Sequence, residues 1–208
     1  SYAPSFGVDK ISNRFARQEI SKLLNRFTNI SVRENQGAEI VSKLVPEKSA
    51  SVVLDPTLLL SSDDWDRFAN KHFTSTDYIL CYLLGDDEKK WKHIKNVARQ
   101  LGLDVKVIPV FPKDYDRNYT IMQGIGPSEF LSLFKNASMV CTDSYHGMIF
   151  SIMYKKKFIA YKRFRDNDKR SQNSRVYSLL NKLGLEDRII VNYNNTLDYN
   201  KDIDYIKV

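Results

Sequence analysis

The chain has 208 residues, enough for one large α/β domain or for one domain with part of another. Hydrophobic residues make up 42% of the chain and charged residues 27%, which excludes wholesale disorder, and no apolar run approaches the roughly 20 residues that cross a membrane. The net charge of +7 leaves three classes of partner open: nucleic acid, an anionic lipid surface, or a small phosphorylated or carboxylated substrate.

The first part of the chain is predicted to alternate between helix and strand. Helices are expected over 9–27 and 38–44, and strands over 29–32 and 51–54. The stretch 33–37 between them has the composition of a loop. A polar stretch with scattered aromatic residues follows over 61–76, and we expect it to link two domains.

From residue 77 onward the alternation becomes regular, and the strands are apolar throughout. Strands are predicted over 78–84, 105–110, 138–142, 158–161 and 188–191, and helices over 88–101, 127–135, 144–154 and 174–183. This pattern predicts an α/β fold with a Rossmann-like parallel sheet that helices cover on both faces. Ligands of such sheets bind beyond the carboxyl ends of the strands.

The two cysteines, Cys81 and Cys141, both fall in predicted strands. We therefore expect buried, reduced thiols and a cytoplasmic protein. Cysteine and histidine residues do not occur at metal-ligand spacing, so no metal is expected. We assign no role to His72 or His93.

The most informative segment is Thr142-Asp-Ser-Tyr-His-Gly147, where a predicted strand runs directly into a helix. The N-terminus of a helix presents backbone N–H groups and the positive end of the helix dipole, and it therefore favours an anion. His146 adds a titratable donor in the first turn. Its alternative is a histidine that caps or packs the helix.

Basic residues cluster just after this helix, in Lys155-Lys-Lys157 and in the loop from Arg163 to Arg170. No recognised nucleic-acid motif accompanies them, so a nucleic-acid partner is not expected. The loop lies over an anionic substrate or is simply a solvated lysine-rich face.

Six segments, in this order and spacing, resemble the polysaccharide pyruvyl transferase family. They run over nearly the whole chain: 1–7, 30–34, 54–60, 78–85, 142–147 and 173–176. The resemblance implies two Rossmann-type domains that face a cleft in a GT-B-like arrangement. By that comparison residues 1–76 hold the C-terminal portion of the first domain plus the link, residues 77–208 hold the second domain, and the N-terminal domain is truncated.

The resemblance also implies an activity. Family members transfer the pyruvyl group of phosphoenolpyruvate to a sugar of a cell-surface polysaccharide or its precursor, usually as a ketal, and release phosphate. Phosphoenolpyruvate would be the donor substrate, and no further cofactor is expected. The acceptor would be a sugar or a lipid-linked oligosaccharide, and the basic surface would allow peripheral association with the inner face of the membrane.

The donor carries a carboxylate and a phosphate, which calls for arginine and for helix N-termini. His146 is expected to protonate the enol carbon or to donate to the phosphate. Arg33 is expected to bind the donor carboxylate or to form an interdomain salt bridge with Glu34 or another acid. Glu34 would orient Arg33 or act as a base. Arg175 is expected to reach phosphate or to pack at a helix end.

The predicted substrate-binding set also includes Ser144, Tyr145 and Gly147. Some relatives read Arg-x-His in this segment, whereas here the arginine position is Ser144. Ser144 either binds phosphate through its hydroxyl or caps the helix. The positive charge for the donor must therefore come from elsewhere.

Two other classes of function stay open. A GT-B glycosyltransferase with a nucleotide-sugar donor would share the fold and the phosphate site at the helix end. A non-enzymatic basic module would instead spread basic and aromatic residues along one helix face, whereas here the basic residues cluster beside an anion-binding turn.

Overall fold

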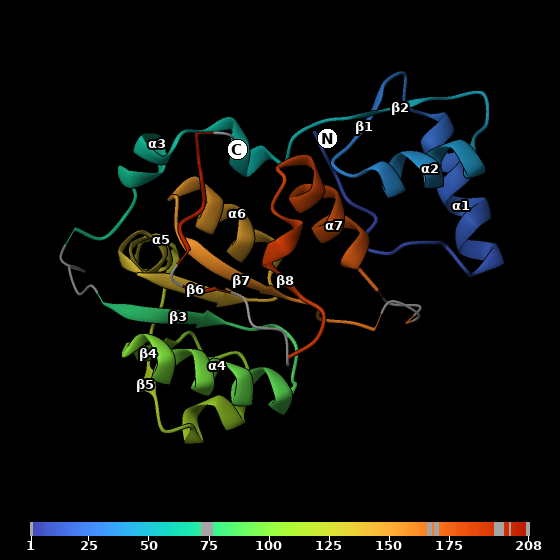
Figure 1. The fold of residues 1–208 in the computed structure, drawn as a ribbon. Coiled ribbons are helices and arrows are strands. Elements are labelled where there is room, and N and C mark those ends of the chain that lie inside the picture. Colours follow the sequence, from blue (N-terminus) through green and yellow to red (C-terminus); the bar gives the residue numbers. More distant parts are fainter. Residues whose placement is uncertain are drawn as a thin grey trace. The chain divides into compact units, whose positions relative to one another are not determined.

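A computed structural model describes residues 2–71, 77–165, 168, 171–193, 198–199 and 201–206 (Figure 1). The chain divides into two compact units. The first unit comprises residues 1–59 and 164–182, and the second comprises residues 60–163 and 183–208. The domain boundary that we expect near residue 76 stays a prediction.

The first unit is built on a short parallel pair of strands with helices packed around it. Its elements are α1 (Arg14–Asn25), β1 (Ile30–Val32), α2 (Asn35–Leu44), β2 (Ala50–Val52), η1 (Pro56–Leu59) and α7 (Asn173–Lys182). β1 and β2 pair in parallel, with Ile30 opposite Ala50. Val32, Ile40 and Val41 are buried and form its core.

Helix α2 begins three residues before the predicted start. The prediction missed this first turn because its residues usually form loops. Asn35, Gln36 and Gly37 are all helical. Gly37 lies tightly against β1, since a Cβ at this position would meet the Cβ of Val32 at 3.1 Å. A glycine that composition assigns to a loop is here the residue that brings the helix close to the strand.

The second unit contains a six-stranded sheet in which all neighbouring strands are parallel, so the predicted α/β fold with a parallel sheet is confirmed. The strand order is β5-β4-β3-β6-β7-β8. The strands are β3 (Tyr78–Tyr82), β4 (Asp104–Val107), β5 (Thr120–Ile121), β6 (Met139–Thr142), β7 (Lys157–Tyr161) and β8 (Ile189–Ile190).

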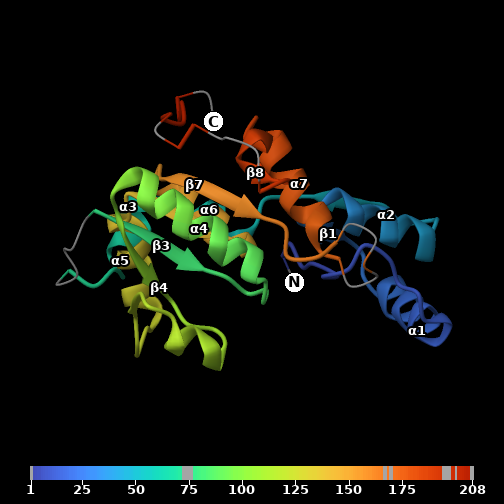
Figure 2. The ribbon, with the colours of Figure 1, turned by 60° about the horizontal axis from the view of Figure 1, so that its bottom comes forward.

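Helices cover both faces of this sheet, as predicted. Figures 1 and 2 show α4 (Glu88–Leu101) on one face, and α5 (Pro127–Asn136) with α6 (Tyr145–Met153) on the other. The unit also holds α3 (Ser62–Asp66), η2 (Pro112–Asp116) and η3 (Glu186–Arg188). α3 lies within the stretch 61–76 that we expect to link two domains, and its start is held by a reciprocal capping box between Ser61 and Asp64.

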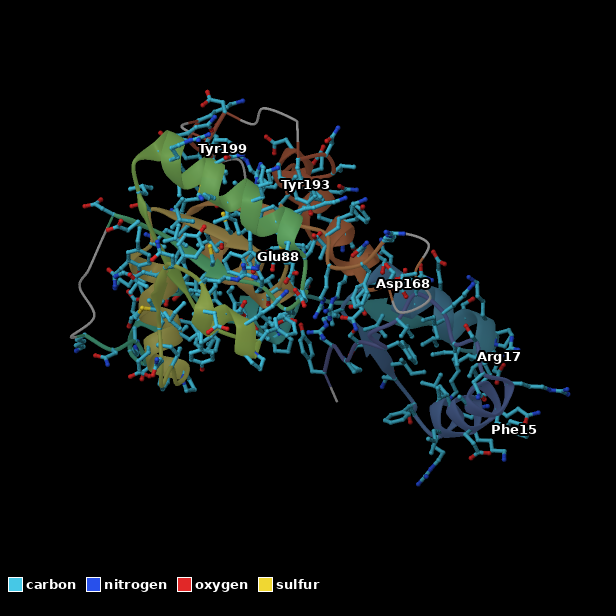
Figure 3. All side chains as sticks on the ribbon, turned by 90° about the horizontal axis from the view of Figure 1, so that it is seen from below. Phe15, Arg17, Glu88, Asp168, Tyr193 and Tyr199 are labelled. Atoms are coloured by element: carbon cyan, nitrogen blue, oxygen red, sulfur yellow. The ribbon has the colours of Figure 1, made fainter. Side chains whose placement is uncertain are left out.

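Tyr193 and Tyr199, near the end of the chain, lie beside α4 (Figure 3). His93 is buried, and its ring nitrogens lie 2.8 Å from the hydroxyl of Tyr161 and 3.0 Å from that of Tyr199. Tyr193 donates a hydrogen bond of 3.1 Å to Asp87, the N-cap of α4. Burial lowers the pKa of His93, because the charged ring loses its hydration.

The order of the strands determines where a ligand would bind. From β3 the chain adds β4 and β5 on one side, and then crosses to add β6, β7 and β8 on the other. The sheet therefore has a topological switch point between β3 and β6, where Tyr82 lies opposite Thr142. Ligands of open α/β sheets bind outside the carboxyl ends of the strands at such a point.

Candidate functional site

The turn from Thr142 to Gly147 lies at this switch point, and its own side chains hold it in place. The Thr142 hydroxyl donates to the carbonyl of Tyr82 at 2.7 Å and accepts from the backbone N–H of Ser144 at 3.0 Å. Ser144 is the N-cap of α6, and its hydroxyl accepts from the N–H of Gly147 at 3.3 Å. Of the two predicted roles of Ser144, the structure contains the capping role.

Gly147 occupies a place where a side chain does not fit. A Cβ there would lie 2.5 Å from the hydroxyl oxygen of Thr142 and 3.2 Å from the Cβ of Ser144. The residue is buried, and its N–H donates to Ser144. Its contribution in the structure is the close packing of the turn, whereas the predicted contact with substrate stays a prediction.

His146 is the exposed residue of this first turn, between buried Tyr145 and buried Gly147. The rings of Tyr145 and His146 meet edge to face, with centroids 5.6 Å apart. The turn therefore presents an imidazole to solvent at the positive end of α6, a position from which it can donate or transfer a proton.

Beneath the turn lies a buried ion pair that sequence reasoning missed. Lys90 of α4 donates to Asp143 over 2.5 Å, and the two side chains are 1% and 0% exposed. Asp143 also accepts from the backbone N–H groups of Leu84 at 2.6 Å and Gly85 at 3.0 Å. One carboxylate thus joins the end of β6 to the loop that follows β3, on both sides of the switch point.

Gly85 completes this arrangement, because a Cβ there would meet three groups at once. Its neighbours would be an Asp143 oxygen at 2.8 Å, the Cγ of Arg163 at 3.0 Å and the Nζ of Lys90 at 3.1 Å. Arg163 follows β7, so the stem of its side chain reaches the same edge of the sheet. The sequence predicts that positive charge must come from somewhere other than position 144, and Arg163 brings a guanidinium group to this region.

The charges at this edge act on their neighbours. Burial raises the pKa of Tyr82, the charge of Asp143 raises it further, and Arg163 opposes both effects. At the start of α4, hydrogen bonds from Arg117 and Lys113 hold the pKa of the exposed Glu88 at about 2. These two cations are therefore engaged with acidic partners.

Arg33 and Glu34 lie together in the first unit, in a network with Asp55. The Arg33 guanidinium lies 2.5 Å from an Asp55 oxygen and 3.6 Å from a Glu34 oxygen. Asp55 also holds its own turn by accepting from the N–H of Thr57 at 2.9 Å, and Glu34 accepts from the hydroxyl of Ser5. Arg33 therefore forms a salt bridge with acidic partners, Asp55 being closer than Glu34, but the pairing lies within the first unit and not between domains as expected.

Arg175 also belongs to the first unit, in the first turn of α7. Its guanidinium donates to the side-chain oxygen of Gln172 at 2.5 Å. Ser174 beside it donates to Asp9 at 2.6 Å, which fixes the start of the helix. The structure thus places Arg33, Glu34 and Arg175 in one unit, and residues 144–147 in the other.

The two residues of the buried ion pair differ in how far the sequence could indicate them. Asp143 lies inside the 142–147 motif, so the sequence places it at the site, but it does not indicate that the carboxylate pairs with a lysine. Lys90 is one lysine of a charged helix and carries no signal, because only the order of the strands brings it to Asp143. His72, and residues 166–167 and 169–170 of the basic loop, lie outside the described residues.

Among the described residues, no group of three or more His, Cys, Asp or Glu side chains could hold a metal ion. Within the same residues, no helix has the length and apolar character that crossing a bilayer requires.

Comparison with known proteins identifies the family of the chain and relates its fold to a solved structure. No curated protein matches the chain in sequence. Among solved structures, the chain is similar to the UDP-GlcNAc 2-epimerase of Methanocaldococcus jannaschii in complex with UDP-GlcNAc and UDP, with a TM-score of 0.55 and 18% identity over 80% of this chain and 51% of that one. At this identity the likeness shows the fold alone, and the chain spans about half the length of that structure. A family model for polysaccharide pyruvyl transferases matches residues 1–163, so the chain belongs to the polysaccharide pyruvyl transferase family.

Proposed function

We propose that this chain takes part in the transfer of a pyruvyl group from phosphoenolpyruvate to a sugar of a cell-surface polysaccharide or its precursor. The observation that carries the proposal is the position of His146. It is an exposed imidazole in the first turn of α6, at the switch point of the sheet, in a chain of the pyruvyl transferase family.

The reaction needs one proton at a defined atom. Carbon 3 of the enol takes a proton, which makes carbon 2 electrophilic, and one sugar hydroxyl then adds to carbon 2. A second hydroxyl displaces the phosphate and closes the ketal. Of the two hydroxyl protons of the sugar, one balances the proton gained by carbon 3 and the other leaves with inorganic phosphate.

His146 is suited to deliver that proton, because histidine exchanges protons near neutral pH and this side chain faces solvent. The backbone at the start of α6 favours the phosphate as it gains charge on leaving. Ser144 and Gly147 maintain the shape of the turn through their own hydrogen bond. Tyr145 packs against the imidazole and limits its orientations.

Two substitutions at His146 separate proton transfer from hydrogen bonding. His146→Gln keeps a neutral donor but cannot act as an acid, so we expect phosphoenolpyruvate to bind while ketal formation and phosphate release are lost. His146→Ala should weaken binding as well. Lys92→Gln, at an exposed position on α4, serves as the control and should behave as the wild type.

The assay is calorimetric binding of phosphoenolpyruvate together with release of phosphate that depends on a sugar acceptor, in the full-length protein. Full turnover by His146→Ala would contradict the assignment. Binding of UDP- or GDP-sugars in place of phosphoenolpyruvate would point instead to a nucleotide-sugar glycosyltransferase.

Arg33 stays a predicted ligand of the donor carboxylate, with Glu34 as its orienting partner or a base and Arg175 as a predicted phosphate contact. In the structure an anion would have to compete with Asp55 for the Arg33 guanidinium. Arg33→Lys removes bidentate binding of the carboxylate. We therefore expect it to weaken the binding of phosphoenolpyruvate by about 1–3 kcal/mol. An unchanged donor affinity would leave Arg33 with its structural pairing alone.

A further inference from the structure

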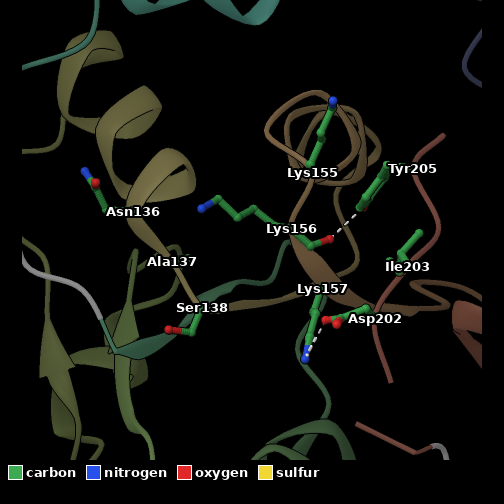
Figure 4. Close-up of a pocket in the computed structure, with 9 residues that line it drawn as sticks. All are labelled: Asn136, Ala137, Ser138, Lys155, Lys156, Lys157, Asp202, Ile203 and Tyr205. Carbon is green, nitrogen blue, oxygen red and sulfur yellow. Dashed lines mark hydrogen bonds and ion pairs between the residues drawn. The ribbon is translucent and has the colours of Figure 1, made fainter. Parts of the chain in front are cut away.

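A polar pocket lies at the opposite edge of the sheet from the His146 turn. It is a cavity of about 350 Å³ at the amino ends of β6 and β7, closed on one side by residues near the end of the chain (Figure 4). Its size is within the range of small-molecule sites. We call it the amino-edge pocket; its lining residues of interest are Ser138, Lys155, Lys156, Lys157, Asp202 and Tyr205.

Because all six strands are parallel, their amino ends share one edge and their carboxyl ends share the other. Ser138 directly precedes β6 and Lys157 begins β7, whereas the His146 turn follows β6. The amino-edge pocket is therefore separate from the turn to which we assign the chemistry.

The connection from α6 to β7 brings three consecutive lysines to this edge. Lys155 has a left-handed backbone with φ of +52°, and the N–H groups of Lys155 and Lys156 bond back to Ile152 and Ser151 at 3.0 and 2.8 Å. This is the hydrogen-bond pattern of a Schellman motif, in which glycine usually takes the left-handed position. A lysine there is strained by roughly 1–2 kcal/mol, so charge is present at a position where stability favours glycine.

Lys156 is the critical side chain. Figure 4 shows it reaching from the start of β7 toward the helix that carries Asn136, and it is partly buried. Its backbone carbonyl accepts from the Tyr205 hydroxyl at 2.6 Å, which fixes its position. Among the described residues its ammonium has no hydrogen bond or ion pair.

The surroundings of this ammonium are electrostatically unfavourable. Burial lowers the pKa of Lys156, and the charge of nearby Lys135 lowers it further. Among the described residues that line the pocket, the acid is Asp202, which is 2.9 Å from Lys157, and Lys135 is paired with Asp66 at 2.6 Å. An anion in the pocket would neutralise a cation that the described residues leave uncompensated.

A buried arginine strengthens the positive potential. Arg188 is 3% exposed, and its charge acts on the Tyr205 hydroxyl that lines the pocket. Within the described residues its Nε and Nη1 atoms make no hydrogen bond, and its ion pair is with adjacent Asp187 at 3.5 Å. The side of the pocket behind Tyr205 is therefore also positive.

We propose that the amino-edge pocket binds a phosphate group, with the Lys156 ammonium as its main contact and the Ser138 hydroxyl as a second donor. Lysine recognises phosphate as a point charge, which suits a pocket that has ammonium groups in place of a guanidinium fork. The phosphate could belong to a soluble phosphate ester or to a lipid headgroup, since both present the same oxygens. The proposal does not depend on the function assigned to His146.

The first test is a titration of this chain with pyrophosphate, followed by backbone amide shifts in NMR spectra. We expect shifts at residues 136–138 and 155–157 that are separate from any shifts at residues 144–147. Lys156→Gln removes the charge and keeps a polar side chain that is one atom shorter, and it should weaken this binding about tenfold or more. Lys95→Gln, the same change at an exposed position on α4, should leave it within about twofold of the wild type.

The second test replaces pyrophosphate by vesicles of neutral lipid with and without an anionic phospholipid. Binding to anionic vesicles alone, lost in Lys156→Gln, would identify a lipid headgroup as the source of the phosphate, whereas pyrophosphate binding lost in that variant would identify a soluble ester. The proposal is overturned if neither probe shifts residues 136–138 and 155–157, or if Lys156→Gln binds as the wild type does. A thermal melt confirms that each variant is folded.

Discussion

Replacing Lys90 by methionine tests the buried ion pair beneath the His146 turn. The change keeps the aliphatic stem, which is buried, and removes the ammonium that lies 2.5 Å from Asp143. It leaves a carboxylate that is 0% exposed, with the N–H groups of Leu84 and Gly85 as its remaining partners. Loss of one partner of such a pair typically costs 3–5 kcal/mol. Since two hydrogen bonds to the carboxylate remain, we expect a loss of about 3 kcal/mol in the free energy of unfolding.

The reverse change, Asp143→Asn, leaves the buried Lys90 ammonium without its carboxylate partner. It should lower the free energy of unfolding by a similar amount. The double variant Lys90→Met with Asp143→Asn removes both charges while keeping one side-chain acceptor for the loop after β3. Two independent changes would add their costs, whereas two partners of one pair should not. We expect the double variant to lose less free energy of unfolding than the two single variants lose together. The difference should be about 2 kcal/mol or more.

Urea unfolding followed by tryptophan fluorescence measures these differences, because Trp91 adjoins Lys90 on α4 and reports on the same unit. Amide exchange at Leu84 and Gly85 gives a local readout, and both amides should exchange faster in Asp143→Asn. A cost below about 1 kcal/mol for Lys90→Met, or costs that add within about 0.5 kcal/mol, would refute the reasoning.

Three further predictions concern single positions. Gly147→Ala forces a Cβ against the Thr142 hydroxyl at 2.5 Å, so it should lower the free energy of unfolding by about 1–3 kcal/mol; a neutral result in urea would show that the turn can shift. Lys155→Gly relieves the left-handed lysine and should raise the melting temperature, and an unchanged or lower value would contradict the strain. Burial lowers the pKa of His93 from 6.5, so the unfolded chain takes up this proton first and stability falls as the pH drops from about 6.5 toward the folded value. His93→Gln should therefore lose less stability than the wild type between pH 7.5 and pH 5.5, and equal losses would exclude this contribution.

The regular part of the fold was predictable because its signals are local. Helix α4 runs from Glu88 to Leu101, as its apolar spacing predicts, because Asp87 caps its start and Gly102 ends it with a left-handed backbone. The short strand β5 was missed, since Thr120 and Ile121 are too few to show a period. The start of α2 was missed because glycine has a low helix propensity, so Gly37 suggests a loop. In the structure Gly37 instead allows close packing against Val32.

The candidate site was predictable only where one segment contains it. Residues 142–147 form a continuous strand-to-helix turn, so His146 could be placed in the first turn of a helix from the sequence. Arg33 could be paired with its neighbour Glu34, but Asp55 lies on a different segment and its pairing with Arg33 depends on the register of β1 and β2. The pairing of Lys90 with Asp143 depends on the order of the strands in the sheet, and composition and periodicity do not indicate that order.

The buried pair and the exposed histidine answer a question that the sequence raises at position 144. By the family resemblance Ser144 stands at the position of an arginine, so we expect the turn to offer one cation fewer to an anionic donor. Lys90 does not supply the missing charge, because its ammonium is 1% exposed and bound to Asp143. Arg163 is better placed, since its stem lies over Gly85 at the carboxyl edge and a side chain on Gly85 would displace it. If a guanidinium of this unit contacts the donor, Arg163→Gln should weaken the binding of phosphoenolpyruvate more than Lys90→Met does. Lys90 stabilises the turn through Asp143 and does not contact the ligand.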